Sequence, residues 1–319
     1  MKLTKNHAIR YGSFDVGDIM RRKTKQTGVL TAKQKSAAKW RAKQQSKKIL
    51  EKQTIDTGAL PETQETDASI EVKLSERFGI LKVLANAACN GEARALIVSG
   101  PAGLSKSYTV EKTLEAWDPT ETQYTIIKGY VRATGLYKAL WQNRHKGRVL
   151  VFDDADTIFF DDTSLNFLKA VLDTTERRRV SYLAETQLYD EAEAVVIPST
   201  FDFDGSCIFI TNYDFDHMIA KGHKLAPHLQ ALVSRAHYVD LSMKTRRDYF
   251  IRIRQVVDEG MLTALGLDTK ESKEVMDFIE VNIDRVRELS LRTAIKVGSI
   301  RKFNRDWEKV ARVTCLKNN

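Results

Sequence analysis

The sequence predicts an α/β fold with a buried parallel sheet, and two observations carry this prediction. First, residues 93–99 form a short apolar run of strand length, which is followed by a glycine-containing loop and then by a helical pattern over 108–117. Second, residues 149–152 are all apolar, as expected for a strand that helices cover on both faces. Strands that alternate with helices in this way indicate a parallel sheet.

The composition is that of a folded chain of roughly two domains. The 319 residues are 42% hydrophobic and 29% charged, and the 16 Gly and 5 Pro exclude a collagen-like or linker-dominated architecture. The three cysteines, Cys89, Cys207 and Cys315, form no CxxC pair, so neither a disulfide framework nor a cysteine-based zinc site is expected. No apolar run approaches the ~20 residues that span a bilayer, and no secretory signal is evident, so we expect a cytoplasmic protein with no membrane partner.

The formal net charge of +9 is concentrated at the N-terminus. Residues 1–52 contain 15 of the 51 Lys and Arg residues but 3 of the 42 Asp and Glu residues, so the remainder of the chain is slightly acidic. This segment is rich in Lys, Gln, Ser and Ala and has no apolar stripe, which predicts a disordered tail. Residues 53–68 are typical of an acidic linker between this tail and the folded part.

The basic tail has two interpretations. It is a nucleic-acid arm if its Lys and Arg side chains neutralise phosphates, which gives a salt-sensitive affinity that is neutral to sequence. Trp40, between Lys39 and Arg41, could then stack on an unpaired base. Alternatively, residues 1–52 are a solvated tail or a segment that docks on another subunit or partner protein.

The loop after the first strand has the residues that phosphate binding requires. Gly100 and Gly103 allow the backbone N–H groups to point inward at phosphate oxygens. The charge of Lys106 would lie on the β- and γ-phosphates of ATP, and the Ser107 hydroxyl would ligate Mg²⁺. The predicted nucleotide-binding residues of this loop are Gly100, Pro101, Ala102, Gly103, Leu104, Ser105, Lys106 and Ser107.

One position departs from the usual pattern GxxxxGK[ST], because Ser105 occupies the place of its last glycine. The alternative interpretation of this loop is an ordinary surface turn whose lysine is solvated. The strand before the loop and the helix after it favour the phosphate-binding interpretation.

Polar residues follow two further predicted strands. Asp153 and Asp154 come directly after the run 149–152, at the strand end where α/β sheets bind ligands. Asp153 would hold Mg²⁺, directly or through water, and Asp154 would polarise the attacking water. The apolar run that begins at Cys207 ends in Asn212, which could orient that water.

The ordered set of motifs resembles that of the AAA+ ATPases over about residues 69–299. Two arginines of this set, Arg235 and Arg292, have an alternative interpretation as members of surface ion pairs. The runs FDDAD, PSTFDFDGSCIFITN and LSLRTAIK are also similar to ATPases encoded by tailed bacteriophages, which implies the host cytoplasm as location. In the resemblance, Lys106 and Ser107 match Walker A, Asp153 and Asp154 match Walker B, Asn212 matches sensor 1, Arg235 matches the arginine finger, and Arg292 matches sensor 2 and would also contact the nucleotide. In the family that the motifs resemble, the position of Asp154 usually holds Glu. Asp is one methylene shorter, so slower hydrolysis is an alternative for this chain.

The resemblance implies an enzyme that uses ATP and Mg²⁺ as cofactors. Its doubly wound P-loop α/β domain would span 69–240, and a small helical lid with a C-terminal helix would span 241–319. Lid helices are expected at 245–259, 272–289, 291–297 and 301–317. A candidate insertion with hairpin character begins at residue 177, and its acidic middle, 189–193, would be exposed. The alternative is an ordinary surface loop.

An arginine finger acts in the neighbouring subunit, so the resemblance also implies a homo-oligomeric ring or spiral, such as a hexamer. Three functions fit these features. The first is a DNA-directed motor or loader that is tethered by residues 1–52. The second is a protein-remodelling ATPase whose tail binds an adaptor, and the third is a slowly hydrolysing nucleotide switch.

Overall fold

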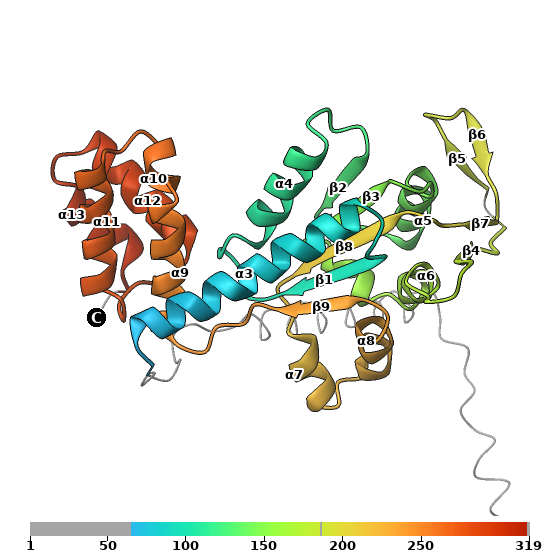
Figure 1. Cartoon of the computed structure of the whole chain (residues 1–319), viewed down its shortest axis with the longest axis horizontal. Helices are drawn as coiled ribbons and strands as arrows, with labels where there is room; N and C mark the ends of the chain where they lie inside the picture. The colour runs from blue at the N-terminus through green and yellow to red at the C-terminus, as the bar shows by residue number, and fades with distance from the viewer. Residues whose placement is uncertain (1–64, 186, 318–319) are drawn as a thin grey trace, which may run out of the picture. The chain divides into compact units, whose positions relative to one another are not determined.

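The computed structural model describes residues 65–185 and 187–317 (Figure 1). The predicted tail, 1–52, and most of the predicted linker lie outside the described residues. The first described helix, α3 (Asp67–Cys89), begins after Thr66, whose side-chain oxygen accepts a hydrogen bond from Ser69 N. The last residues of the expected linker therefore belong to this helix.

A five-stranded sheet in the order β2-β3-β8-β1-β9 forms the centre of the α/β part, and every neighbouring pair is parallel. This confirms the predicted fold class. Because β8 lies between β1 and β3, the residues that follow these three strands meet at one edge of the sheet. The strands are β1 (Ala95–Ser99), β2 (Tyr124–Lys128), β3 (Val149–Asp153), β8 (Ser206–Thr211) and β9 (His237–Asp240).

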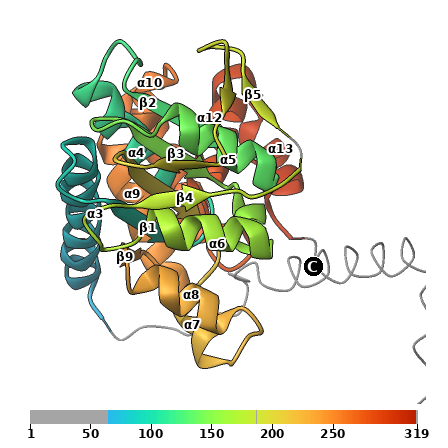
Figure 2. The same ribbon diagram turned by 90° about the vertical axis from the view of Figure 1, so that its right-hand side faces the viewer.

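Helices cover both faces of the sheet (Figure 2), as the doubly wound prediction requires. Leu96 and Val98 of β1 belong to one hydrophobic core, which α3 completes together with α4 (Lys106–Trp117). Ala95 and Ile97 belong to a second core on the opposite face. That second core is built by α5 (Ala133–Gln142), η2 (Asp156–Phe159), α6 (Asp162–Val171), α7 (Phe215–Ala220) and α8 (Ala226–Val233).

The predicted insertion forms two short antiparallel pairs of strands. Its acidic middle is exposed at residues 189 and 191–193, as predicted, but the prediction was wrong for Asp190, which is fully buried. The carboxylate of Asp190 accepts a hydrogen bond of 3.0 Å from Gln142 Nε2 of α5, and this contact draws the hairpin onto the helix. The pairs are β4 (Arg179–Ser181) with β7 (Thr200–Asp202), and β5 (Leu188–Asp190) with β6 (Val195–Ile197).

A group of helices follows β9 and forms the predicted lid. Among the described residues, no helix combines the length and the apolar character that crossing a membrane requires. The lid helices are α9 (Arg246–Asp258), α10 (Met261–Ala264), α11 (Thr269–Val281), α12 (Leu291–Phe303) and α13 (Trp307–Cys315).

Three predicted lid helices have different bounds. The helix expected over 291–297 continues to Phe303, where α12 ends. The helix expected over 272–289 ends at Val281, because Asn282 Nδ2 donates a 2.8 Å bond to the Phe278 carbonyl and the following residues leave the helix. The helix expected over 301–317 is divided at Asn304, which has an extended backbone. The Oδ1 of Asn304 accepts a hydrogen bond of 2.8 Å from Asp306 N.

The C-terminal helix packs on the lid, as predicted. Trp307 of α13 contacts Phe278 of α11 with 5.5 Å between ring centroids. The indole and the phenyl ring meet edge to face, a favoured arrangement of aromatic pairs.

Candidate nucleotide-binding site

The loop between β1 and α4 depends on its glycines. Gly103 has a φ of +75°, and a Cβ on it would lie 2.7 Å from the Cβ of Ser290 in the lid. Gly100 has a φ of +154°, and a Cβ there would lie 3.0 Å from the Cβ of Leu241. Both positions therefore combine an unusual backbone with close neighbours, and only glycine satisfies both conditions without displacement.

The start of α4 has the features of a helix end that suits an anion. Ser105, which precedes the helix, has a left-handed backbone (φ 73°, ψ 12°), and its side chain does not cap the helix. The first N–H groups of an α-helix have no partner within the helix. Together with the positive end of the helix dipole, these donors suit a phosphate group.

Lys106 lies in the centre of the site and is 5% exposed. Its Nζ donates to the carbonyls of Gly100 at 2.7 Å and Pro101 at 2.8 Å, and to Asn212 Oδ1 at 2.9 Å. Burial lowers the pKa of Lys106 to about 8, although nearby carboxylates, led by Asp154, oppose this effect. The ammonium group is therefore mostly charged at neutral pH.

Ser107 and Asp153 are joined across the site. Ser107 Oγ donates a 2.7 Å hydrogen bond to Asp153 Oδ1. The other oxygen of this carboxylate lies 3.2 Å from Nζ of Lys128, which also pairs with Glu111 at 2.5 Å. Sequence reasoning missed Lys128, but its place at the end of β2, opposite Asp153 in the register of the sheet, is a signal that a strand alignment would have revealed.

The Asn212 side chain joins Lys106 to Asp154. Its Nδ2 donates to Asp154 Oδ1 at 2.9 Å, while its Oδ1 accepts from Lys106. Asp154 has a φ of 52°, an unusual conformation for a residue with a side chain, and its N–H donates to the Ile210 carbonyl at 3.1 Å. Desolvation and the charge of Asp153 raise the pKa of Asp154.

A second carboxylate–hydroxyl pair lies beside this contact. Thr211 Oγ1 donates a 2.6 Å hydrogen bond to Asp156 Oδ1. Burial raises the pKa of Asp156 to about 6, and the bond from Thr211 opposes the shift. Sequence reasoning assigned no role to Asp156, although it is the last acidic residue of the FDDAD run.

The two predicted arginines differ in their relation to the site. Arg292 stands at the start of α12, and its charge adds to the effect of burial that lowers the pKa of Lys106 and opposes the effect of burial that raises the pKa of Asp154. Arg235 donates a 2.7 Å bond to the Ala231 carbonyl at the end of α8. In the described contacts of this single chain, Arg235 does not join the loop 100–107.

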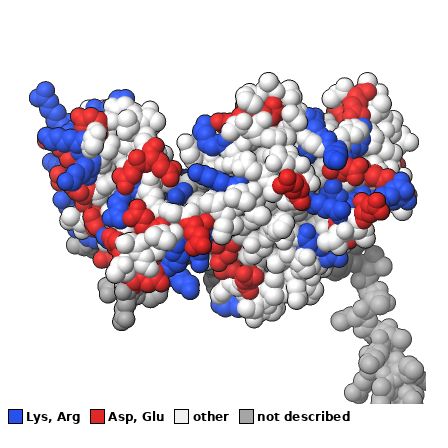
Figure 3. Space-filling view, viewed as in Figure 1, with Lys and Arg blue, Asp and Glu red and all other residues white. Residues whose placement is uncertain are grey.

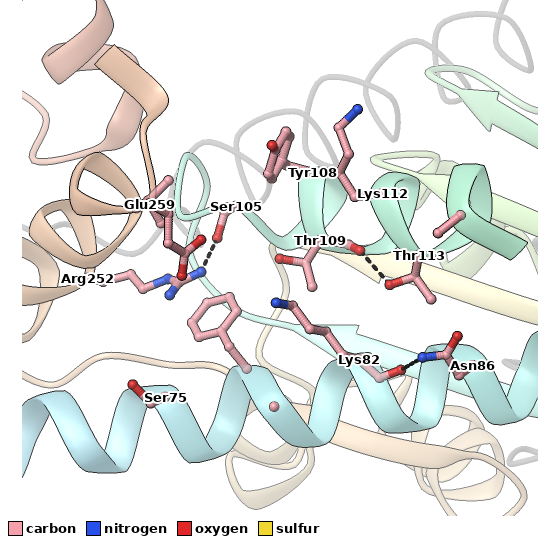
Figure 4. A pocket seen from close by; sticks show the side chains of 14 residues that line it. Ser75, Lys82, Asn86, Ser105, Tyr108, Thr109, Lys112, Thr113, Arg252 and Glu259 are labelled. Atoms are coloured by element: carbon pink, nitrogen blue, oxygen red, sulfur yellow. Dashed lines mark hydrogen bonds between the residues drawn. The ribbon is translucent and has the colours of Figure 1, made fainter. Parts of the chain in front are cut away.

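A cavity of about 490 Å³ lies beside the loop, between α3, α4 and α9 (Figure 4). Ser105, Tyr108 and Thr109 line it from the loop and α4, and Arg252 lines it from α9. Arg252 Nη2 donates a 2.6 Å hydrogen bond to Ser105 Oγ. Sequence reasoning missed this contact, since the two residues are 147 positions apart and neither lies in a motif that pairs them.

The donor set fits a magnesium nucleotide. In the described part of the chain, no cluster of three or more His, Cys, Asp or Glu side chains could bind a metal by itself. Ser107 and Asp153 nevertheless present a hydroxyl and a carboxylate at 2.7 Å from each other. Mg²⁺ prefers such oxygen ligands and commonly binds one or two protein groups together with phosphates. Both cofactors expected from the sequence thus match the residues present.

Comparisons with known proteins give one relative of high similarity. The chain is 37% identical over 261 residues to the "uncharacterized 36.7 kDa protein in nrdC-mobD intergenic region" of Enterobacteria phage T4, a match that covers 81% of this chain and 79% of that protein. No protein-family model matches the chain.

Solved structures with a similar fold include a point mutant of RuvB from Thermotoga maritima and the ORC2 protein of Aeropyrum pernix. RuvB is 13% identical with a TM-score of 0.43, over 80% of this chain and 73% of that chain. ORC2 is 12% identical with a TM-score of 0.43, over 83% and 72%.

The sheet order, the glycine-containing loop before α4 and the carboxylates after β3 define an α/β fold of the P-loop class. Within this class, the chain belongs to the family of the phage T4 protein, with which it shares four-fifths of its length.

Proposed function

We propose that this protein binds ATP with Mg²⁺ and hydrolyses it, and that it acts on nucleic acid as a homo-oligomer. One observation supports the enzymatic part above all others. A continuous set of hydrogen bonds joins Lys106 through Asn212 to Asp154, beside the bond from Ser107 to Asp153. The groups that hold phosphate, metal and water in nucleotide hydrolysis thus lie within hydrogen-bond reach of one another.

Each group has a defined task in this proposal. Lys106 and the N–H groups at the start of α4 bind the phosphates, with the loop from Gly100 to Ser105 as their backbone cradle. Ser107 and Asp153 hold Mg²⁺, which neutralises charge that develops on the phosphoryl oxygens.

Three polar residues complete the site. Asp154 orients the attacking water and accepts its proton, and Asn212 fixes the Asp154 carboxylate. Arg292 adds positive charge from the lid.

Arg235 has its role in a second subunit. Its guanidinium is bonded at the end of α8 and is not joined to the loop of its own chain in the described contacts. We assign it to the site of a neighbouring copy, where an arginine stabilises the transferred phosphoryl group. A ring or spiral of identical subunits, such as a hexamer, provides such a neighbour.

The nucleic-acid part of the proposal depends on residues 1–52. On the face drawn in Figure 3, Lys and Arg side chains are interspersed with Asp and Glu side chains over the lid and the α/β part. The positive charge of residues 1–52 is, by contrast, almost unbalanced. This distribution favours the tail as the segment that contacts a phosphate backbone.

The test is an ATPase assay with and without single- and double-stranded DNA, on the full chain and on a chain that lacks residues 1–52. We expect DNA to stimulate hydrolysis by the full chain only, and the stimulation to weaken as salt rises. Lys106→Ala should abolish nucleotide binding, because it removes the central cation of the phosphate site. Hydrolysis that is indifferent to DNA would instead favour a protein-remodelling ATPase.

A slow nucleotide switch is the second candidate, and Asp154 favours it. The carboxyl group of Asp154 is one methylene closer to the backbone than that of the usual glutamate, and its backbone is held at a φ of 52°. Tight ATP binding without measurable turnover, with or without DNA, would support this candidate. The variant Asp154→Glu should then increase turnover.

A further inference from the structure

Ser105 has a left-handed backbone conformation, which is unusual for a residue that carries a side chain. Its φ of 73° is a conformation that glycine adopts freely and that costs free energy for other L-residues. Such residues persist where their surroundings hold them, and they concentrate at functional sites. Ser105 immediately precedes Lys106, so its backbone sets the direction in which the first turn of α4 faces a ligand.

Arg252 of α9 is the partner of Ser105, and it is 5% exposed. Its Nη2 donates to Ser105 Oγ at 2.6 Å, its Nη1 donates to Gln255 Oε1 at 3.2 Å, and its guanidinium lies 3.6 Å from the ring centroid of Phe78. Its Nε is buried and has no hydrogen-bond partner. Burial lowers the pKa of Arg252 to about 10, so the group remains charged at neutral pH.

A buried charge that lacks an ion pair is unusual. No salt bridge to Arg252 exists among the described residues, whereas other arginines of the lid, such as Arg254, pair with carboxylates of α3. The negative charge of Glu259 acts on Arg252, but no salt bridge joins the two residues. Removing an arginine from water without a directly bonded carboxylate is costly, so such a group is not expected from stability alone. The contacts of Arg252 instead connect three elements: α3 through Phe78, the lid through α9, and the phosphate-binding loop through Ser105.

The lid also contacts the loop at a second point, where Leu291 N donates to the Gly103 carbonyl at 2.8 Å. This bond joins two backbone groups, so it does not depend on a particular side chain. The contact at Ser105 differs, because it requires both the serine that replaces glycine and the arginine that reaches it. The Figure 4 view shows this pair at the wall of the cavity.

We propose that Arg252 is a positioning residue of the ATP site: from the first lid helix it holds Ser105, and with it the start of α4, in the arrangement that receives phosphate. The inference rests on the proposed nucleotide binding, which it extends with a lid residue outside the known motifs. Ser105 then has a role that glycine could not fill, because its hydroxyl accepts the hydrogen bond through which the lid fixes the loop.

A double-mutant cycle tests the pair. We expect Arg252→Met to weaken binding of a fluorescent ATP analogue with Mg²⁺ about tenfold, the loss of one hydrogen bond to a charged group. Arg252→Lys should restore part of the affinity. In the S105G background, R252M should have little further effect. Arg254→Met is the matched control, because it removes an arginine of the same helix that contacts α3 but not the loop, and it should leave affinity unchanged.

Hydrogen exchange of the ligand-free proteins gives an independent readout. R252M should accelerate exchange of the amides between residues 100 and 108, and R254M should not. If the parent protein fails to bind ATP, the proposed function is wrong, but the exchange result still decides whether Arg252 holds the loop. The inference is overturned if loop exchange is unaffected by R252M. It is also overturned if R252M weakens binding equally with Ser105 present and in the S105G background, which would indicate a general loss of lid structure.

Discussion

The lid closely approaches the phosphate-binding loop at Gly103. Gly103 is therefore the most informative position at which to add a single methyl group by substitution. In Gly103→Ala the new Cβ would lie 2.7 Å from the Cβ of Ser290 and 3.2 Å from its Oγ. Real Cβ atoms do not tolerate the first distance, so the loop or the start of α12 must move. The same movement breaks the bond from Leu291 N to the Gly103 carbonyl.

The magnitude follows from two contributions. Alanine at a φ of +75° costs about 1–2 kcal/mol of folding free energy wherever it occurs. Forcing an extra methyl group into a packed contact costs about 1–3 kcal/mol more. Gly91 separates these contributions, since it has the same φ of +75° but no atom within 4 Å of the position its Cβ would take.

Chemical denaturation of Gly103→Ala and Gly91→Ala measures the difference. We expect Gly103→Ala to be less stable than Gly91→Ala by about 1–3 kcal/mol and to bind ATP more weakly, while Gly91→Ala keeps the parent affinity. Ser290→Gly, which removes the opposing Cβ, should restore part of the loss. Equal destabilisation by the two alanine variants, with equal ATP affinity, would refute the lid–loop contact as described.

Two further predictions concern the subunit contact and pH. Arg235→Ala should bind ATP normally but hydrolyse it about 10³–10⁵ times more slowly, and mixing it with Lys106→Ala should recover some activity, because each variant supplies the group that the other lacks. Hydrolysis by Arg235→Ala at the parent rate would contradict the assignment. Burial raises the pKa of Asp156 from 3.8 to about 6, so the unfolded chain releases this proton first and the folded state loses stability as pH rises from about 4 to about 6. Asp156→Asn keeps an oxygen that accepts from Thr211, and it should remove this dependence of stability on pH. The variant should be more stable than the parent at pH 7 by up to about 3 kcal/mol of unfolding free energy. Parallel profiles of unfolding free energy against pH for the two proteins would contradict this.

The fold and the central site residues follow from local sequence patterns. Strands that are covered on both faces are apolar throughout, so 149–152 identified β3 without knowledge of its neighbours. Parallel strands point their carboxyl ends toward the same edge of a sheet, which explains why Lys106, Asp153 and Asn212 meet although they are distant in sequence.

Helix ends were predicted less well, because they depend on side-chain bonds rather than on periodicity. Asn304 shows this clearly. The apolar pattern continues past it, but its side chain bonds to Asp306 N and its backbone is extended, so the helix stops. The buried Asp190 is a similar case, since only the packing of the insertion on α5 brings Gln142 to it.

The sequence by itself determined that this chain is an α/β P-loop protein with a lysine, a hydroxyl and paired aspartates at one sheet edge. Those features are local: a loop between a strand and a helix, or residues that directly follow a strand. The tertiary structure alone decided which side chains complete the site. Lys128 reaches Asp153 through sheet register, and Arg252 reaches Ser105 through the docking of the lid. Such pairs depend on the register and docking of elements that are remote in the chain, and no local motif contains both partners.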